Sequence, residues 1–184
     1  VDRFFNISNS ANAPVASTGE TQRGINSVFG SAALAWKDML FLDLSARNDW
    51  SSTLPKANNS YFYPSASLSF AVSEIAEIKE SDVINFAKVR VSLAQAGNDS
   101  DAYRLTDVYN PITPSFGNLP LYSVPNSRQN PDLVNELTTE FEVGFLVKLL
   151  GNRLSIDAAY YDRTTENQIF NVPVSATTGY TSKL

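Results

Sequence analysis

The stretch TTEFEVGFLVKLLGNRLSIDAAYYDR, residues 138–163, decides the fold. Its two halves alternate apolar and polar residues, which is the period of a β-strand. Gly151 and Asn152 between them form a typical two-residue hairpin turn. That turn pairs apolar residues on one face: Leu149 with Leu154, Val147 with Ile156, Phe145 with Ala158 and Val143 with Tyr160. A shift by one residue would mix the two faces, so the sequence specifies this register.

The opposite face of the hairpin is more polar. Its expected pairs are Leu146 with Asp157, Glu142 with Tyr161 and the oppositely charged Glu140 with Arg163. Each arm has about a dozen residues and spans roughly 40 Å. Strands of soluble proteins average about 5 to 6 residues, whereas a strand tilted across a bilayer needs about 9 to 11. The hairpin therefore predicts an all-β fold, a segment of an antiparallel transmembrane β-barrel with an apolar exterior and a polar lumen.

The composition excludes several classes of function. The sequence has no His and no Cys, which removes Cys nucleophiles, Ser-His triads, disulfides and zinc sites built on these residues. Its 14 basic and 19 acidic residues give a formal net charge of -5, which argues against nucleic-acid binding. No apolar run is long enough for a membrane helix. Only 18% of the residues are charged and 11% are aromatic. The mean hydropathy is slightly negative, as it is in barrel proteins, because lumen-facing residues dilute the lipid-facing ones.

Four further strands are expected before the hairpin, at residues 25–37, 40–47, 61–72 and 86–96. The first two should be joined by a three-residue turn at 37–39, because an odd number of loop residues keeps Leu34 opposite Leu42. Residues 73–85 carry acidic side chains between Ile and Ala, and we expect a helical turn there.

The connections alternate between long and short. Long loops are expected at residues 1–24, 48–60 and 98–137 and after residue 164, where turn formers are abundant. This alternation is typical of an up-and-down outer-membrane barrel, with long loops outside the cell and short turns in the periplasm. Aromatic residues near the strand ends are typical of interfacial girdles, and they are Trp36, Trp50, Tyr61, Phe62, Tyr63, Phe141, Tyr160 and Tyr161.

Several stretches, read together, resemble the SusC/RagA family of TonB-dependent outer-membrane transporters of the Bacteroidetes. They are SVFGSAALAWKDMLFLDLSARNDWSSTLP (27–55), NSYFYPSASLSF (59–70), FAKVRVSLAQAGND (86–99), NPDLVNELTTEFEVGF (130–145) and NRLSIDAAYYDRTTENQIFNVPVSATTGY (152–180). The resemblance covers most of the chain. No single stretch is a catalytic signature, but their order and spacing are specific.

The resemblance implies a barrel of about 22 strands with an N-terminal plug, of which this chain supplies about six strands. The chain starts at Val1 rather than Met, so we expect residues 1–184 to be an internal part of the barrel domain, without the plug, TonB box, signal sequence and C-terminal strand. The implied function is import of glycans or peptides with a SusD-like surface lipoprotein as lid, powered through TonB. Membrane lipid is a further expected partner, and no enzyme activity or cofactor is expected.

Two sets of side chains are candidates for the site. The residues expected to face the lumen are Asp43, Arg47, Lys88, Arg90, Glu140, Glu142, Asp157 and Arg163. The loop aromatics expected to contact substrate or lid are Trp50, Tyr103, Tyr109, Phe116 and Tyr122, although internal packing of the long loop explains the last four equally well. Lys88 and Arg90 could meet an anionic substrate, but pairing with lumen carboxylates is the simpler interpretation.

Three alternative interpretations fit the sequence less well. Glu140 and Glu142 lie roughly 7 Å apart, which is within the carboxyl spacing of an inverting glycosidase, yet the wall of a polar channel explains them better. Residues 98–101, Asn-Asp-Ser-Asp, lack the spaced ligands of a calcium loop and are interpreted as a loop apex. A soluble β-sandwich that binds carbohydrate would have shorter strands and two facing cores.

Overall fold

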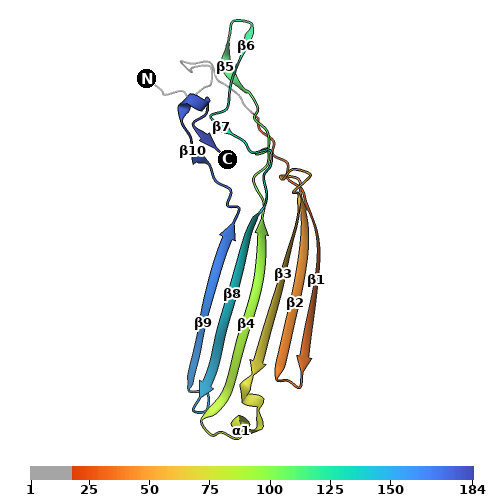
Figure 1. Ribbon diagram of the computed structural model, residues 1–184, viewed down its shortest axis with the longest axis vertical. Coiled ribbons are helices and arrows are strands. Elements are labelled where there is room, and N and C mark those ends of the chain that lie inside the picture. The colour runs from red at the N-terminus through yellow and green to blue at the C-terminus, as the bar shows by residue number, and fades with distance from the viewer. Residues whose placement is uncertain (1–17) are drawn as a thin grey trace, which may run out of the picture.

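The computed structural model describes residues 18–184 (Figure 1). Six long strands form one antiparallel sheet: β1 (Ile25–Trp36), β2 (Leu40–Ser51), β3 (Ser60–Ala71), β4 (Ile84–Asn98), β8 (Glu136–Leu149) and β9 (Leu154–Glu166). Each of the six pairs with the next, so the sheet is an up-and-down meander. The predicted all-β antiparallel fold is confirmed. The expected loop at residues 1–24 lies outside the described residues as far as residue 17.

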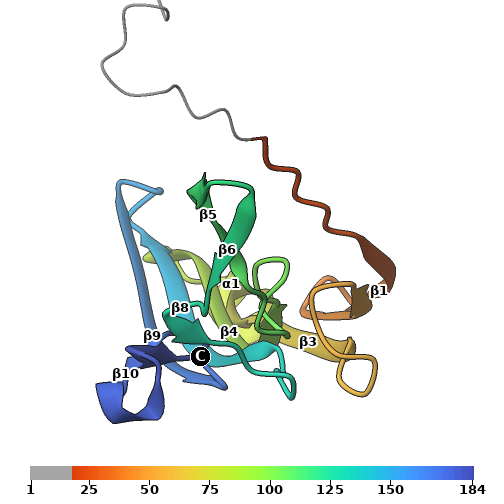
Figure 2. The same ribbon diagram turned by 90° about the horizontal axis from the view of Figure 1, so that it is seen from above.

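The sheet is curved and open, with β1 and β9 as its two edges (Figure 2). We call one end of the sheet the turn end; it carries residues 37–39, 72–83 and 150–153. The second of these connections contains η2 (Val72–Glu74) and α1 (Ala76–Lys79), which confirms the expected helical turn. No helix among the described residues is long and apolar enough to span a bilayer.

The opposite end, which we call the loop end, carries residues 52–59, 99–135 and 167–184 (Figure 1). Its short elements are β5 (Asn110–Phe116), β6 (Leu119–Ser123), β7 (Ser127–Arg128), β10 (Val172–Pro173), η3 (Ala176–Thr178) and β11 (Ser182–Lys183). β5 and β6 pair only with each other and form a separate hairpin, whereas β10, β11 and β7 form a small sheet. The stretch 98–137, expected to be irregular throughout, therefore contains regular structure.

The register of the β8–β9 hairpin is the predicted one in every pair, from Leu149 opposite Leu154 to Glu140 opposite Arg163. Gly151 and Asn152 both have positive φ, 65° and 64°, as a type I′ turn requires. Asn85 fixes this turn from the neighbouring connection, because its Oδ1 accepts hydrogen bonds from the backbone N–H groups of Gly151 (2.7 Å) and Asn152 (3.1 Å).

The turn between β1 and β2 also has the predicted length. Three residues separate Trp36 from its partner Leu40, and Leu34 stands opposite Leu42. The N–H of Met39 donates to the carbonyl oxygen of Trp36 at 3.0 Å. The requirement for an odd number of loop residues was sufficient to predict the length of this turn, because alternating apolar and polar residues define both faces of each strand.

The two faces of the sheet separate apolar from polar residues across all six strands. One ladder row on the apolar face consists of Leu34, Leu42, Leu68, Val91, Val143 and Tyr160. The next row on the opposite face consists of Ala33, Asp43, Ser67, Ser92, Glu142 and Tyr161. Within residues 18–184 no second layer covers the apolar face, where Leu34 is 61% exposed. The β-sandwich alternative, which needs two facing cores, is therefore wrong.

The predicted strand bounds are too short at the loop end. The loop expected at 48–60 is shorter, since β2 continues to Ser51 and β3 begins at Ser60. The polar residues there stay in the ladder because side chains satisfy them: Asn48 Nδ2 donates to Ser60 Oγ at 3.0 Å, and Asp49 is held by Arg47 and Tyr63.

Candidate functional site

All eight residues expected to face a lumen lie on the polar face of the sheet. Arg90 on β4 is the centre of the largest cluster. Its Nε lies 3.0 Å from Glu142 Oε1 on β8, and its Nη1 lies 3.1 Å from Asp157 Oδ1 on β9. One guanidinium thus joins three adjacent strands.

Gly144 makes this reach possible. It stands directly opposite Arg90 in the β4–β8 ladder, and a Cβ at this position would lie 2.8 Å from Arg90 Cζ. Cβ atoms do not approach other heavy atoms this closely, so any side chain at position 144 would displace the guanidinium. The glycine therefore leaves room for Arg90 to lie across β8 and reach Asp157.

Two further ion pairs lie on this face. Glu140 pairs with Arg163, as predicted from the register. Arg47 Nε lies 2.7 Å from Asp49 Oδ1, and the hydroxyl of Tyr63 donates to the same carboxylate. Asp49 is not among the residues predicted to face the lumen, because it lies in a stretch expected to be a loop.

Asp43 and Lys88 differ from the other six. Within the described residues neither has an ion-pair partner, and both line a hollow of about 290 Å³ on the polar face. Phe41 and Ser69 form part of its wall. The hollow therefore presents one negative and one positive group that are both available to a further partner.

The ion pairs on the polar face are typical of the lining of a channel rather than of a catalytic site. Glu140 and Glu142, the pair weighed as glycosidase carboxylates, are each engaged by a guanidinium from a neighbouring strand. Within residues 18–184 no group of three His, Cys, Asp or Glu residues could hold a metal ion.

The connections at the loop end pack on one another around a small core that the sequence did not reveal. Leu54, Tyr61 and Leu133 are buried, and four partly buried residues pack against them: Tyr63, Leu105, Ile169 and Leu184. The core thus joins residues from the β2–β3 connection, the 99–135 segment and the segment after β9. It ties these three segments of the loop end together.

Asp99 is the polar counterpart of this core. Its side chain is 1% exposed; it pairs with Arg23 and accepts hydrogen bonds from the hydroxyls of Ser51 and Thr53, the latter at 3.0 Å. Residues 98–101 were expected to form a loop apex, and this is wrong because Asp99 and Ser100 are buried between β4 and the β2–β3 connection. Arg23, Ser51 and Thr53 are far away in sequence, so no local pattern indicates them.

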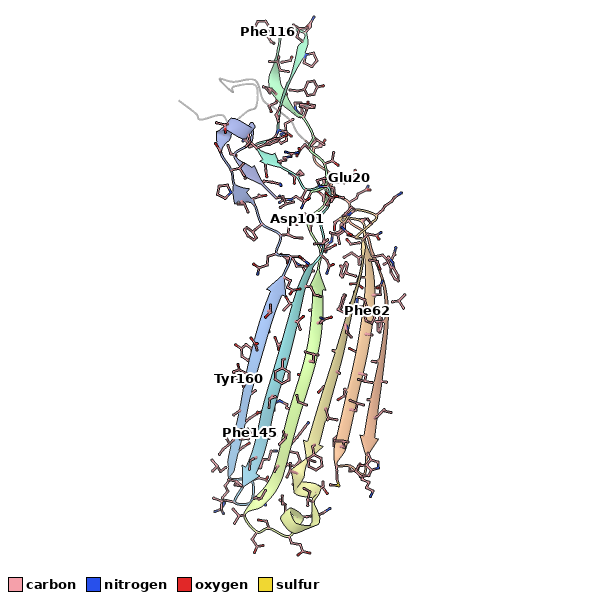
Figure 3. All side chains as sticks on the ribbon, in the orientation of Figure 1. Glu20, Phe62, Asp101, Phe116, Phe145 and Tyr160 are labelled. Carbon is pink, nitrogen blue, oxygen red and sulfur yellow. The ribbon has the colours of Figure 1, made fainter. Side chains whose placement is uncertain are left out.

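Three of the predicted contact aromatics lie on or beside the β5–β6 hairpin. Tyr109, Phe116 and Tyr122 are all exposed, and Figure 3 shows Phe116 at the far tip of this hairpin. Tyr103 is also exposed, and its hydroxyl accepts a hydrogen bond from the Gln22 N–H at 3.2 Å. Internal packing of the loop, the alternative explanation, does not account for these exposed rings.

Trp50 does not lie in a loop as expected. It is in β2, paired with Ser60, on the apolar face of the sheet. This is the position of an interfacial aromatic at the end of a membrane-crossing strand.

The sequence of this chain matches a known protein family and several of its curated members. The family model described as TonB dependent receptor-like, beta-barrel, matches residues 2–182. Among curated relatives, TonB-dependent receptor P26 of Formosa agariphila is 26% identical over 184 residues, which cover 98% of this chain and 19% of the relative. TonB-dependent receptor P39 of the same organism is 27% identical over 179 residues, which cover 97% of this chain and 17% of the relative.

Solved structures share the fold. The RagAB peptide importer in its closed-closed state matches 99% of this chain and 20% of its own with a TM-score of 0.84 and 24% identity, and another structure of the RagAB peptide transporter matches with a TM-score of 0.83. The chain thus spans about a fifth of the length of the proteins it matches. The resemblance found in the sequence is confirmed: the chain belongs to the TonB-dependent receptor β-barrel family.

Proposed function

We propose that the complete protein is an outer-membrane importer of oligomeric nutrients, glycans or peptides, and that this chain supplies six strands of its barrel wall. The observation that carries this proposal is the sheet itself, whose apolar residues share one uncovered face and whose ion-paired charges share the other. A bilayer tolerates backbone only in helices or closed barrels, so β1 and β9 need further strands of the complete protein as neighbours.

The loop end faces the outside of the cell and the turn end faces the periplasm. The lengths of the connections support this orientation, because outer-membrane barrels have long loops outside and short turns inside. The eight charged residues of the polar face then line the lumen. Asp43 and Lys88 are the two that a plug or a passing substrate could engage.

A SusD-like surface lipoprotein forms the lid, and the β5–β6 hairpin contacts it. Residues 108–124 contain no charged side chain, and exposed aliphatic and aromatic residues follow one another along them. Depletion of charge with enrichment of aromatics is typical of the centre of a protein interface. Pro111 and Pro120 remove backbone donors from the two hairpin strands, so the contact is made by side chains rather than by adding a strand.

Uptake by whole cells tests the import function. The complete gene is deleted from its host and restored on a plasmid, in cells with and without TonB, and uptake of labelled oligosaccharides and peptides is measured. We expect uptake of at least one ligand class to require both genes. Uptake that survives loss of TonB would contradict energised import, and a complete protein that is soluble without detergent would contradict the barrel.

A further inference from the structure

A polar hollow of about 320 Å³ lies at the loop end, where β4 ends and β8 begins. Residues 98–101 form one wall, Arg104 and Glu136 stand beside it, and residues 169–171 of the segment after β9 complete it. The volume is within the range of about 300 to 1,000 Å³ of small-molecule sites. We propose that this hollow binds a unit of a neutral saccharide, an inference that rests on the proposed import function and names its ligand.

The walls of the hollow are held in place before any ligand arrives. Glu136 joins two of them, since its Oε2 accepts from Asn98 Nδ2 at 3.0 Å and its Oε1 accepts from the Ile169 N–H at 2.7 Å. Asp99 is fixed by Arg23, Ser51 and Thr53 as described above. Ile169 also packs against the buried core of the loop end. A site fixed in this way loses little conformational entropy when it binds a ligand.

Several polar groups in the hollow remain available. Ser100 is 6% exposed and lines the hollow, yet within residues 18–184 its hydroxyl makes no hydrogen bond. Arg104 Nη2 and Asp101 Oδ2 are 3.4 Å apart, a contact too loose to use the hydrogen-bonding capacity of either group. Asn171 Oδ1 accepts from Ser127 Oγ at 3.3 Å, which leaves the amide NH₂ as a donor. The hollow therefore offers donors and acceptors side by side.

Sugar hydroxyls match this arrangement, because each hydroxyl can donate to a carboxylate such as Asp101 while it accepts from a guanidinium such as Arg104. Phe170 lines the hollow, is 61% exposed as a residue, and offers an apolar ring face for the C–H groups of a pyranose. A peptide would need apolar subpockets for its side chains, and the lining is mostly polar.

The charge of the lining selects neutral sugars. Arg23 neutralises Asp99, so two carboxylates, those of Asp101 and Glu136, stand against one guanidinium, that of Arg104, in the lining of the hollow. Sulfated or uronate-containing saccharides would bring further negative charge into this site and be repelled.

The hollow also lies on the route of import. Asn98 and Glu136 are the last and first residues of β4 and β8, and their places in the ladder put both on the polar face. Figure 3 shows Asp101 just beyond the strand ends. A saccharide bound here would stand at the mouth of the lumen.

Binding by the purified complete receptor tests the inference. The detergent-solubilised protein is applied to an array that carries neutral, sulfated and uronate-containing oligosaccharides and to a casein peptide pool, and calorimetry then gives Kd for the strongest neutral oligosaccharide. We expect binding to neutral oligosaccharides, weakened about tenfold or more by Arg104→Gln and by Phe170→Ala. Arg153→Gln removes the same charge at the turn end and should leave Kd unchanged.

Each other outcome overturns the inference: no binding to any neutral oligosaccharide, binding only to acidic saccharides or peptides, or neutral binding that neither Arg104→Gln nor Phe170→Ala weakens. Heat-modifiability on gels confirms that each variant barrel is folded. Cells that import peptides while the receptor binds no saccharide would remove this inference and leave the import function standing. Cells that import neither class would remove the import function itself.

Discussion

Gly144 is the residue on which the Arg90 cluster depends. We expect Gly144→Ala to push the guanidinium away from Asp157 and to destabilise the barrel by at most about 1 kcal/mol, because the new Cβ would overlap the flexible end of Arg90 and the ion pair lost is partly exposed. The unfolding midpoint of the complete protein in detergent measures this. Gly30→Ala is the matched control, since a Cβ at position 30 meets nothing within 4 Å. If the two variants unfold alike, the close approach of Arg90 is not stabilising.

Asp99 should be the residue most sensitive to substitution at the loop end. Asp99→Ala leaves Arg23 without its carboxylate and the hydroxyls of Ser51 and Thr53 without their acceptor, which costs about 3 kcal/mol. We expect limited proteolysis of intact cells to cleave the loop end faster in this variant. Asp132→Asn, at an exposed position of the same end, should resist protease as the wild type does. Equal resistance of Asp99→Ala would show that the core of Leu54, Tyr61 and Leu133 holds the loops alone.

The contact partners of residues in the strand ladder could be predicted from the sequence, whereas those of residues at the loop end could not. Glu140 and Arg163 were paired correctly because alternation and one turn fix every partner along two strands. The partners of Asp99 come from two separate segments, at Arg23 and at Ser51 and Thr53, which no periodicity connects to it. Register is a local property of a hairpin, whereas burial of a loop carboxylate depends on how separate connections pack.

Among the elements, the β5–β6 hairpin is the most exposed to a partner. If the proposed lid lipoprotein binds this hairpin, we expect the triple variant Tyr109→Ser, Phe116→Ser and Tyr122→Ser to reduce its co-purification about tenfold or more, because large exposed aromatics dominate interface energies. Barrel assembly should be unaffected, since β5 and β6 pair only with each other. The matched control on the same hairpin is Asn110→Ser, Thr113→Ser and Asn118→Ser. If the aromatic variant retains the lid fully, the lid does not bind through the β5–β6 hairpin.

The β8–β9 and β5–β6 hairpins differ in whether their strands have one apolar and one polar face. The β8–β9 hairpin was predicted because both of its faces are specified. The β5–β6 hairpin was read as irregular because residues 110–123 carry apolar side chains and prolines without alternation, since neither face packs on a sheet. A strand pair without a buried face lacks the period from which strands are recognised.

For the whole molecule, the apolar band crosses the sheet at a slant. On β1 the band begins at Val28, six residues before Leu34, whereas on β9 it begins at Tyr160, which lies in the same ladder row as Leu34. At the turn end it finishes with Trp36 on β1 but continues on β8 to Leu149, four residues past the row of Trp36. A shift of about one residue per strand corresponds to a tilt of roughly 35°, as barrel strands require.

Depth measurements on the reconstituted complete receptor can test this slant. Nitroxide labels at Leu34, Leu68 and Tyr160 occupy one ladder row, yet they should lie at different depths: Tyr160 near the outer interface, Leu68 near the bilayer centre and Leu34 past the centre toward the periplasmic interface, so that Leu68 has the highest ratio of oxygen to nickel access. Because oxygen concentrates in the bilayer centre and a charged nickel chelate in water, their relative access to a label reports its depth. Labels at Ser67 and Ser92, on the polar face, should show no lipid-depth signal. Equal depth along the row, or exclusion of oxygen from all three labels, would mean that another protein layer rather than hydrocarbon covers this face, and the barrel assignment would fail.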